Sequence, residues 1–196
     1  MTVKSRSRME EELEQLLVTS IADQQPAGAP VADAAQPVKT KEIVIVAESG
    51  DLERTWASLI LATSAAAAGM TVTLFFTFWG LFPLVRADQR ITGRNWMQRG
   101  LSILNRPGIT HLKLSRMNFF GMGPWMMKRL ARQQGVAQPA ELLEIAQAMG
   151  VRLIPCQMSL DMLGIGREQL IDGVEEPAGA AAALELMASA DATLFI

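Results

Sequence analysis

The amino-acid sequence predicts an α/β fold, in which a mostly parallel sheet of about five strands lies between helices in a three-layer α/β/α arrangement. Short apolar runs alternate with segments of helical periodicity along most of the chain, a pattern typical of parallel sheets. The apolar runs are nearly continuous, as strands covered on both faces require. Hydrophobic residues make up 49% of the 196-residue chain, which is enough for the core of one domain.

The expected elements can be placed in order along the chain. The strands are expected at Ile43–Ala47, Thr71–Phe78 and Val151–Pro155, around Leu170–Val174 and at Thr193–Ile196. The main helices are expected at Leu52–Ala68, 121–134, 139–150, Cys156–Leu163 and Ala178–Ala190. Between residues 79 and 120 the pattern is irregular and predicts a short helix broken at Pro83, a segment without a clear period at 91–108, and a short strand or loop at 111–115.

Residues 1–40 differ in composition from the rest of the chain. Residues 9–22 (MEEELEQLLVTSIA) predict a short amphipathic helix with glutamates in its first turn, where they suit the positive end of a helix. Residues 24–40 are rich in Ala, Pro and Gly and weakly charged, which is typical of a linker. The sequence therefore predicts an N-terminal helix and linker over 1–40 and a folded domain over 41–196.

No charged side chain lies between Arg54 and Arg86, and a run of this length suits a membrane span. The run is not uniform, however, because Ala- and Leu-rich residues come first, Gly69 interrupts them, and β-branched and aromatic residues follow. This order favours a helix, a turn and a buried strand over a span. The N-terminus lacks the apolar core of a signal peptide, so the cytoplasm is the expected compartment.

Composition and charge exclude several classes of protein. The chain has one cysteine and one histidine, too few for a disulfide framework, a Cys-rich zinc site or most histidine-based metal sites. The net charge of -2 gives no indication of nucleic-acid binding, and neither a G-x-G-x-x-G motif nor a P-loop is present, so no cofactor is predicted. The charge is unevenly distributed: residues 86–132 carry ten basic and one acidic side chain, and residues 133–196 carry two and nine.

Cys156 is the strongest candidate for chemistry. It directly follows a predicted buried strand and precedes a predicted helix, and ligands of open α/β sheets bind beyond the carboxyl ends of the strands. Unpaired N–H groups and the dipole at a helix N-terminus favour the thiolate form. The alternative is that Cys156 is a small core residue beside Pro155 and Met158, and the residues alone leave both interpretations open.

Other candidates carry weaker signals. The loop Ser49–Asp51 has backbone N–H groups that suit an anion, and the arginines of the basic block suit oxyanions, although each of them is also consistent with a solvated face. His111 and Asp161 are consistent with structural or solvent-facing roles. A soft apolar cluster in the middle of the chain predicts a core or a subunit interface; it comprises Met117, Phe119, Phe120, Met122, Trp125, Met126 and Met127.

Three stretches carry a resemblance to a known family: the Ser-Gly-Asp loop after the first strand, TLFFTFWGL, and above all PCQMSLDMLGI. Over residues 41–196 the sequence resembles the DsrE/DsrF/DsrH-like family, in the sulfur-relay branch that is labelled peroxiredoxin-like. The resemblance implies an α/β/α domain, a homo-oligomer, and a cytoplasmic carrier that holds sulfane sulfur or a thiosulfonate on Cys156. It also implies a TusA-like sulfur carrier and a rhodanese-like donor as partners.

The chain differs from some members of this family in its number of cysteines. Two other functions also remain consistent with its sequence. Some relatives have a second cysteine, and its absence here counts against an internal resolving step. No T-x-x-C signature surrounds Cys156, so peroxidase activity is not expected. The alternatives are a non-catalytic oligomeric binding module with a buried cysteine, and a membrane-associated relative in which the uncharged run or the Met-rich stretch contacts lipid.

Overall fold

The computed structural model describes residues 41–89, 98, 108–116 and 121–196. The predicted helix at 9–22, the linker at 24–40 and most of segment 91–108 lie outside these residues. The division of the chain at residue 41 therefore stays a prediction.

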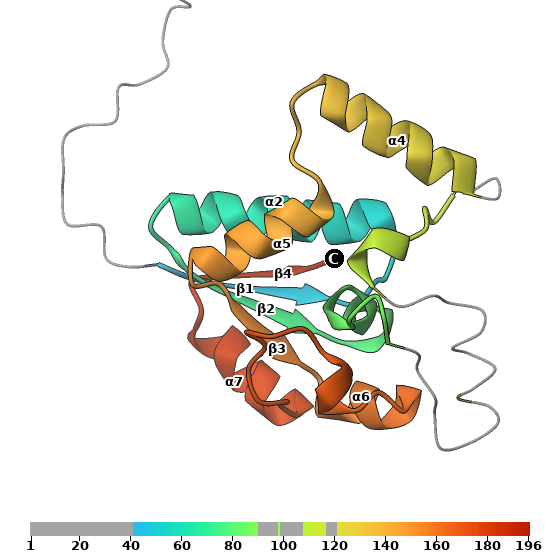
Figure 1. The fold of residues 1–196 in the computed structure, drawn as a ribbon. Coiled ribbons are helices and arrows are strands. Elements are labelled where there is room, and N and C mark those ends of the chain that lie inside the picture. Colours follow the sequence, from blue (N-terminus) through green and yellow to red (C-terminus); the bar gives the residue numbers. More distant parts are fainter. Residues whose placement is uncertain (1–40, 90–97, 99–107, 117–120) are drawn as a thin grey trace, which may run out of the picture. The chain divides into compact units, whose positions relative to one another are not determined.

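Four parallel strands form one sheet in the order β3-β2-β1-β4. The strands are β1 (Glu42–Ala47), β2 (Thr71–Phe76), β3 (Arg152–Pro155) and β4 (Ala192–Phe195). Helices α2 (Leu52–Ala67) and α5 (Pro139–Ala148) cover one face of the sheet, and α7 (Ala180–Ser189) covers the other, with α6 (Gln157–Leu163) beyond the end of β3 (Figure 1). The predicted three-layer α/β/α class is confirmed.

The predicted fifth strand around Leu170–Val174 is wrong. Leu170 makes only an isolated antiparallel bridge to Val85, and the N–H of Ile171 donates to the carbonyl of Leu84 at 2.8 Å. Gly173 then adopts a φ of +78°, which turns the chain away and ends the pairing. The apolar residues of this segment contribute to the core, but they extend no sheet, so four strands are present in the described part of the chain.

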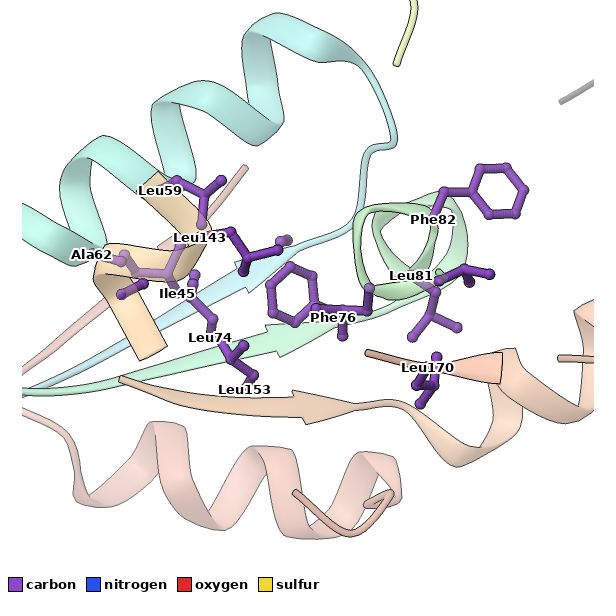
Figure 2. Packing of buried hydrophobic residues seen from close by; sticks show 14 of the residues in the cluster. Ile45, Leu59, Ala62, Leu74, Phe76, Leu81, Phe82, Leu143, Leu153 and Leu170 are labelled. Atoms are coloured by element: carbon purple, nitrogen blue, oxygen red, sulfur yellow. The ribbon is translucent and has the colours of Figure 1, made fainter. Parts of the chain in front are cut away.

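Figure 2 shows the main core, which lies between the sheet and helices α2 and α5. Alternate residues of the strands point into it, among them Ile45, Leu74 and Leu153, which are fully buried. Helix α2 presents Leu59 and Ala62 to the same core, as the helical period requires. This packing fixes the strand ends from which the candidate site is built.

The uncharged run between Arg54 and Arg86 forms α2, a turn at Gly69, β2 and the 3₁₀ helix η1 (Phe78–Leu84), which confirms the predicted helix, turn and strand. Pro83 lies inside η1 and does not break it. Among the helices that the structure describes, none has the length and apolar character needed to cross a bilayer.

The remaining described helices follow η1 along the chain. They are η2 (Ile109–His111), α4 (Met122–Gln133) and η4 (Arg167–Gln169). Helix α5 begins with Pro139 and with a capping box in which the N–H of Gln138 donates to Glu141 at 2.8 Å. Residues 111–115, predicted as a strand or a loop, form the end of η2 and a loop that makes a single bridge, from Lys113 to Asp51.

Gly80 allows η1 to pack directly on the end of β1. Its N–H donates to the carbonyl of Glu48 at 2.9 Å, and a Cβ added at Gly80 would lie 2.1 Å from the carbonyl oxygen of Ala47. We expect Gly80→Ala to lower the free energy of unfolding by about 1–3 kcal/mol, because backbone has to shift to admit the methyl group. Urea denaturation measures the change. Gly179→Ala is the control, since no atom lies within 4 Å of its added Cβ, and an equal loss in both variants would contradict this explanation.

Candidate functional site

Cys156 lies directly after β3, at the edge of the sheet where the carboxyl ends of the strands meet. It occupies the N-cap position of α6, as the sequence predicted, with an extended backbone. Its side chain is 3% exposed and packs in a small apolar cluster with Val46, Phe75 and Ile154. The structure thus combines the two interpretations of this residue, because a cysteine at a strand end is also buried among apolar side chains.

The backbone around Cys156 is held from both sides. Its N–H donates to the carbonyl of Phe76 in β2 at 2.8 Å, and its own carbonyl accepts from the N–H of Leu160 at 3.0 Å. On the other side, the N–H of Gln157 donates to the carbonyl of Ala178 at 3.0 Å. The backbone at Cys156 is therefore held by the sheet and by the segment that precedes α7.

Ser159 attaches α6 to the end of β2. It is fully buried, and its hydroxyl lies 3.0 Å from that of Thr77, with which it shares a hydrogen bond. The N–H of Phe78 also donates to Ser159 Oγ at 3.0 Å. Phe78 has a φ of +45°, which is uncommon for a side chain other than glycine, and this hydrogen bond helps to hold it there. Ser159 is thus a positioning residue for the chain on which Cys156 lies.

Helix α7 packs on the apolar cluster that contains Cys156. Ala183 is the only residue of α7 that is classed as buried, and Leu186 and Met187 are half-buried against the same cluster. Leu184, on the same helix, is 63% exposed. Because few side chains of α7 contribute to the packing, we expect this helix to separate from the sheet more readily than α2 does.

The basic block is only partly described. Arg90, Arg94, Arg99 and Arg106 lie outside the described residues. Arg86 donates through Nε to the carbonyl of Leu170 at 2.8 Å and lies 3.8 Å from Asp172. Among the described residues, no hydrogen bond links an arginine to Cys156, and the approach of an arginine to the thiol stays a prediction.

Three of the five remaining basic residues of the block, Lys128, Arg129 and Arg132, lie on α4, together with exposed apolar side chains. Met122 and Trp125 are 57% and 60% exposed, and Arg129 lies over the Trp125 ring at 5.7 Å. Burial, followed by the charge of Arg132, lowers the pKa of Lys128. A groove of about 830 Å³ beside α4 is lined by Met126, Met127 and Leu130 among others. Of the apolar cluster predicted from the sequence (the Met/Trp cluster), Met117, Phe119 and Phe120 lie outside the described residues. Its described members are exposed rather than part of the core, and the subunit interface stays a prediction.

The loop Ser49–Asp51 lines a cavity of about 320 Å³ at the carboxyl end of β1. Ser49 Oγ accepts from the N–H of Asp51 at 3.1 Å and donates to its carboxylate at 3.0 Å. His111 and Lys113 line the same cavity.

The side chain of Asp161 is exposed and accepts a hydrogen bond from Gln157 at 3.0 Å. In the part of the chain described, no three His, Cys, Asp or Glu side chains come together in a possible metal site.

Ser159, Thr77 and the packing of α7 near Cys156 were not predicted from the sequence. The sequence could have predicted Ser159, because a residue three positions after Cys156 lies on the inner side of the short helix that follows it. The packing of α7 could not have been predicted in this way, since the residues of α7 are ordinary alanine, leucine and methionine. Their contact with Cys156 depends on how α7 packs against the sheet.

Comparison with known proteins identifies the family. The family model described as "DsrE/DsrF/DrsH-like family" matches residues 39–195. The chain is 35% identical over 158 residues to the uncharacterized protein YrkE of Bacillus subtilis, covering 81% of this chain and 98% of that one. It is 36% identical over 162 residues to the sulfur carrier protein DsrE2 of Allochromatium vinosum, covering 81% of this chain and all of that one.

A solved structure has the same fold. The crystal structure of the ychN protein from E. coli matches with a TM-score of 0.51 and 20% identity, covering 80% of this chain and all of that one. The parallel sheet with helices on both faces, the family match over nearly the whole described region and two relatives above 30% identity all agree. The chain therefore belongs to the DsrE/DsrF/DsrH-like family.

Proposed function

We propose that this protein is a sulfur carrier of a sulfur relay, and that it holds sulfane sulfur or a thiosulfonate on Cys156. The observation that carries the proposal is the position of the only cysteine, at the carboxyl end of β3 and directly before α6. Membership of the DsrE/DsrF/DsrH-like family and 36% identity to a protein named as a sulfur carrier support it. By the same resemblance, the protein acts in the cytoplasm as a homo-oligomer, between a rhodanese-like donor and a TusA-like acceptor.

The chemistry requires a single thiol and no net oxidation. The Cys156 thiolate attacks the sulfane sulfur of thiosulfate, a sulfur–sulfur bond forms at Cys156, and sulfite leaves with the electron pair of the broken bond. A donor persulfide reacts in the same way and leaves as a thiolate, whereas attack on tetrathionate forms a thiosulfonate on Cys156 and releases thiosulfate. In the second step the thiolate of an acceptor attacks the outer sulfur of the persulfide, and Cys156 leaves as a thiolate.

Because the thiol is 3% exposed, the exchange requires α7 and its preceding segment to open. Opening a weakly packed helix is a smaller event than global unfolding, and local openings of this kind have their own lower free energies. The proposal therefore includes a closed form, in which the sulfur is protected from solvent, and an open form that meets the partner.

The test is sulfur loading of the purified full chain. The protein is incubated with thiosulfate, tetrathionate or a persulfide donor, and its intact mass is measured before and after reduction. We expect a sulfur-containing mass increase that reduction removes, and the size of the increase identifies a persulfide or a thiosulfonate. The absence of any adduct with all three donors would count against the proposal.

A second candidate function is a non-catalytic binding module in which Cys156 is a core residue. The burial of Cys156 among Val46, Phe75 and Ile154 favours it. Thiol labelling separates the two candidates: a carrier labels in the native state faster than it unfolds globally, whereas a structural cysteine labels only as fast as the protein unfolds. The two rates are measured with a chromogenic disulfide reagent and by denaturant jump.

A further inference from the structure

The sheet has two edge strands, and the chain covers one of them. Along β3, the N–H of Glu175 donates to the carbonyl of Leu153 at 2.9 Å, and the N–H of Ala178 donates to the carbonyl of Pro155 at 3.0 Å. The covering segment contains Pro177, and Glu175 also forms a bidentate pair with Arg152. Proline, charge and a covering segment are the usual means by which a protein protects an edge from further pairing.

Within the part of the chain that the structure describes, the other edge strand, β4, has none of these features. Residues 192–196 (ATLFI) contain neither a charge nor a proline. The N–H of Ile196 donates to the carbonyl of Val46, and the N–H of Glu48 donates to the carbonyl of Ile196, so Ile196 turns its backbone groups toward β1. Because these groups alternate along a strand, those of Thr193 and Phe195 face outward. Within the described residues, β4 is the last strand on its side of the sheet.

The side chains of β4 also suit a partner strand. Phe195 is 65% exposed, and its register partner Val46 belongs to the apolar cluster on the α7 face. Thr193 Oγ1 donates to the carbonyl of Met187 in α7 at 3.4 Å, which places Thr193 on the same face. An aromatic and a β-branched side chain therefore lie on one face of an unprotected edge, and this combination stabilises cross-strand pairs.

We propose that β4 pairs with β4 of a second copy of this chain, antiparallel and across a two-fold axis at Leu194. In that register Thr193 of each copy lies opposite Phe195 of the other, and their outward groups supply about four hydrogen bonds. Identical uncharged segments bring no charge repulsion, and each Phe195 ring packs against a threonine. The two four-stranded sheets become continuous, with both α7 helices on the same face. This interface does not depend on the sulfur chemistry of Cys156.

Amide hydrogen exchange and mass in solution test the pairing with the full chain. We expect a dimer or a larger even-numbered oligomer, in which the amides of Thr193 and Phe195 are protected. Phe195→Lys should reduce the mass by half and make both amides exchange rapidly, because it places lysine beside the ladder. Thr193→Pro should also break the oligomer and expose the Phe195 amide, because it removes an N–H that faces the partner. It leaves the hydrogen bonds between β4 and β1 intact. Leu184→Lys is the control, since it makes a similar change at an exposed site on α7, and it should leave the oligomer unchanged.

Three results would overturn the proposal. The first is a wild-type chain that is monomeric at every concentration. The second is an oligomer whose Thr193 and Phe195 amides exchange rapidly, because its interface then lies elsewhere. The third is protection of both amides in a monomer, because another segment of the same chain then covers the edge.

Discussion

Cys156→Ser will abolish sulfur loading with thiosulfate, tetrathionate and persulfide donors alike. Cys156 is the only thiol in the chain, and a hydroxyl forms no persulfide under these conditions. The expected effect is complete loss of the reducible mass increase that the wild-type chain shows. Intact mass spectrometry under identical incubation measures it.

The control for this variant addresses folding. A serine hydroxyl among the apolar side chains of Val46, Phe75 and Ile154 is expected to lower the free energy of unfolding by about 1–3 kcal/mol, because burial removes its hydrogen bonds with water. Cys156→Ala removes the thiol without adding a polar group and is therefore measured beside it. Urea denaturation shows that both variants are folded. An adduct that persists on either folded variant would show that sulfur is held at another residue.

Leu186→Ala will accelerate the reactions of Cys156. Leu186 is half-buried against the cluster around the thiol, so its truncation weakens the contact between α7 and the sheet. A loss of about 1–2 kcal/mol in the free energy of opening raises the open population, and with it the labelling rate, by about 5–30-fold. The native labelling rate with a chromogenic disulfide reagent measures the effect.

Leu184→Ala is the matched control for Leu186→Ala. It makes the same chemical change on the same helix at a side chain that is 63% exposed, and we expect little change in labelling. Sulfur loading should follow the labelling rates in both variants. Equal rates in the two variants would mean that access to Cys156 does not depend on the packing of α7.

The sequence was sufficient for the fold class because the apolar pattern changes its period where the structure changes element. The uncharged run between Arg54 and Arg86 illustrates this, since Gly69 separates its helix from its strand as expected. The predicted fifth strand was wrong because strand pairing depends on tertiary contacts, which the local sequence pattern does not reveal. Leu170 and Ile171 are apolar because they contribute to the core, and their backbone bonds to Leu84, Arg86 and Arg167 rather than to a strand of the sheet.

The candidate site was only partly accessible to the same reasoning. The place of Cys156 between strand and helix follows from local sequence, and the structure agrees. Its burial does not follow, because the apolar cluster that contains Cys156 joins α7 to three strands through tertiary packing. The Met/Trp cluster shows that an apolar stretch of sequence is not always buried. Its described residues are exposed on α4, because nothing in the described part of the chain packs over them.

The central claim is that sulfur held on Cys156 passes to another protein. The most direct measurement is to load the wild-type chain, remove the donor, add a purified TusA-like protein in its reduced form, and follow the intact masses of both chains with time. The account predicts that the acceptor gains the sulfur that this chain loses, and that Leu186→Ala speeds the transfer. Sulfur that stays on this chain, or that leaves only as sulfide without appearing on the acceptor, would contradict it.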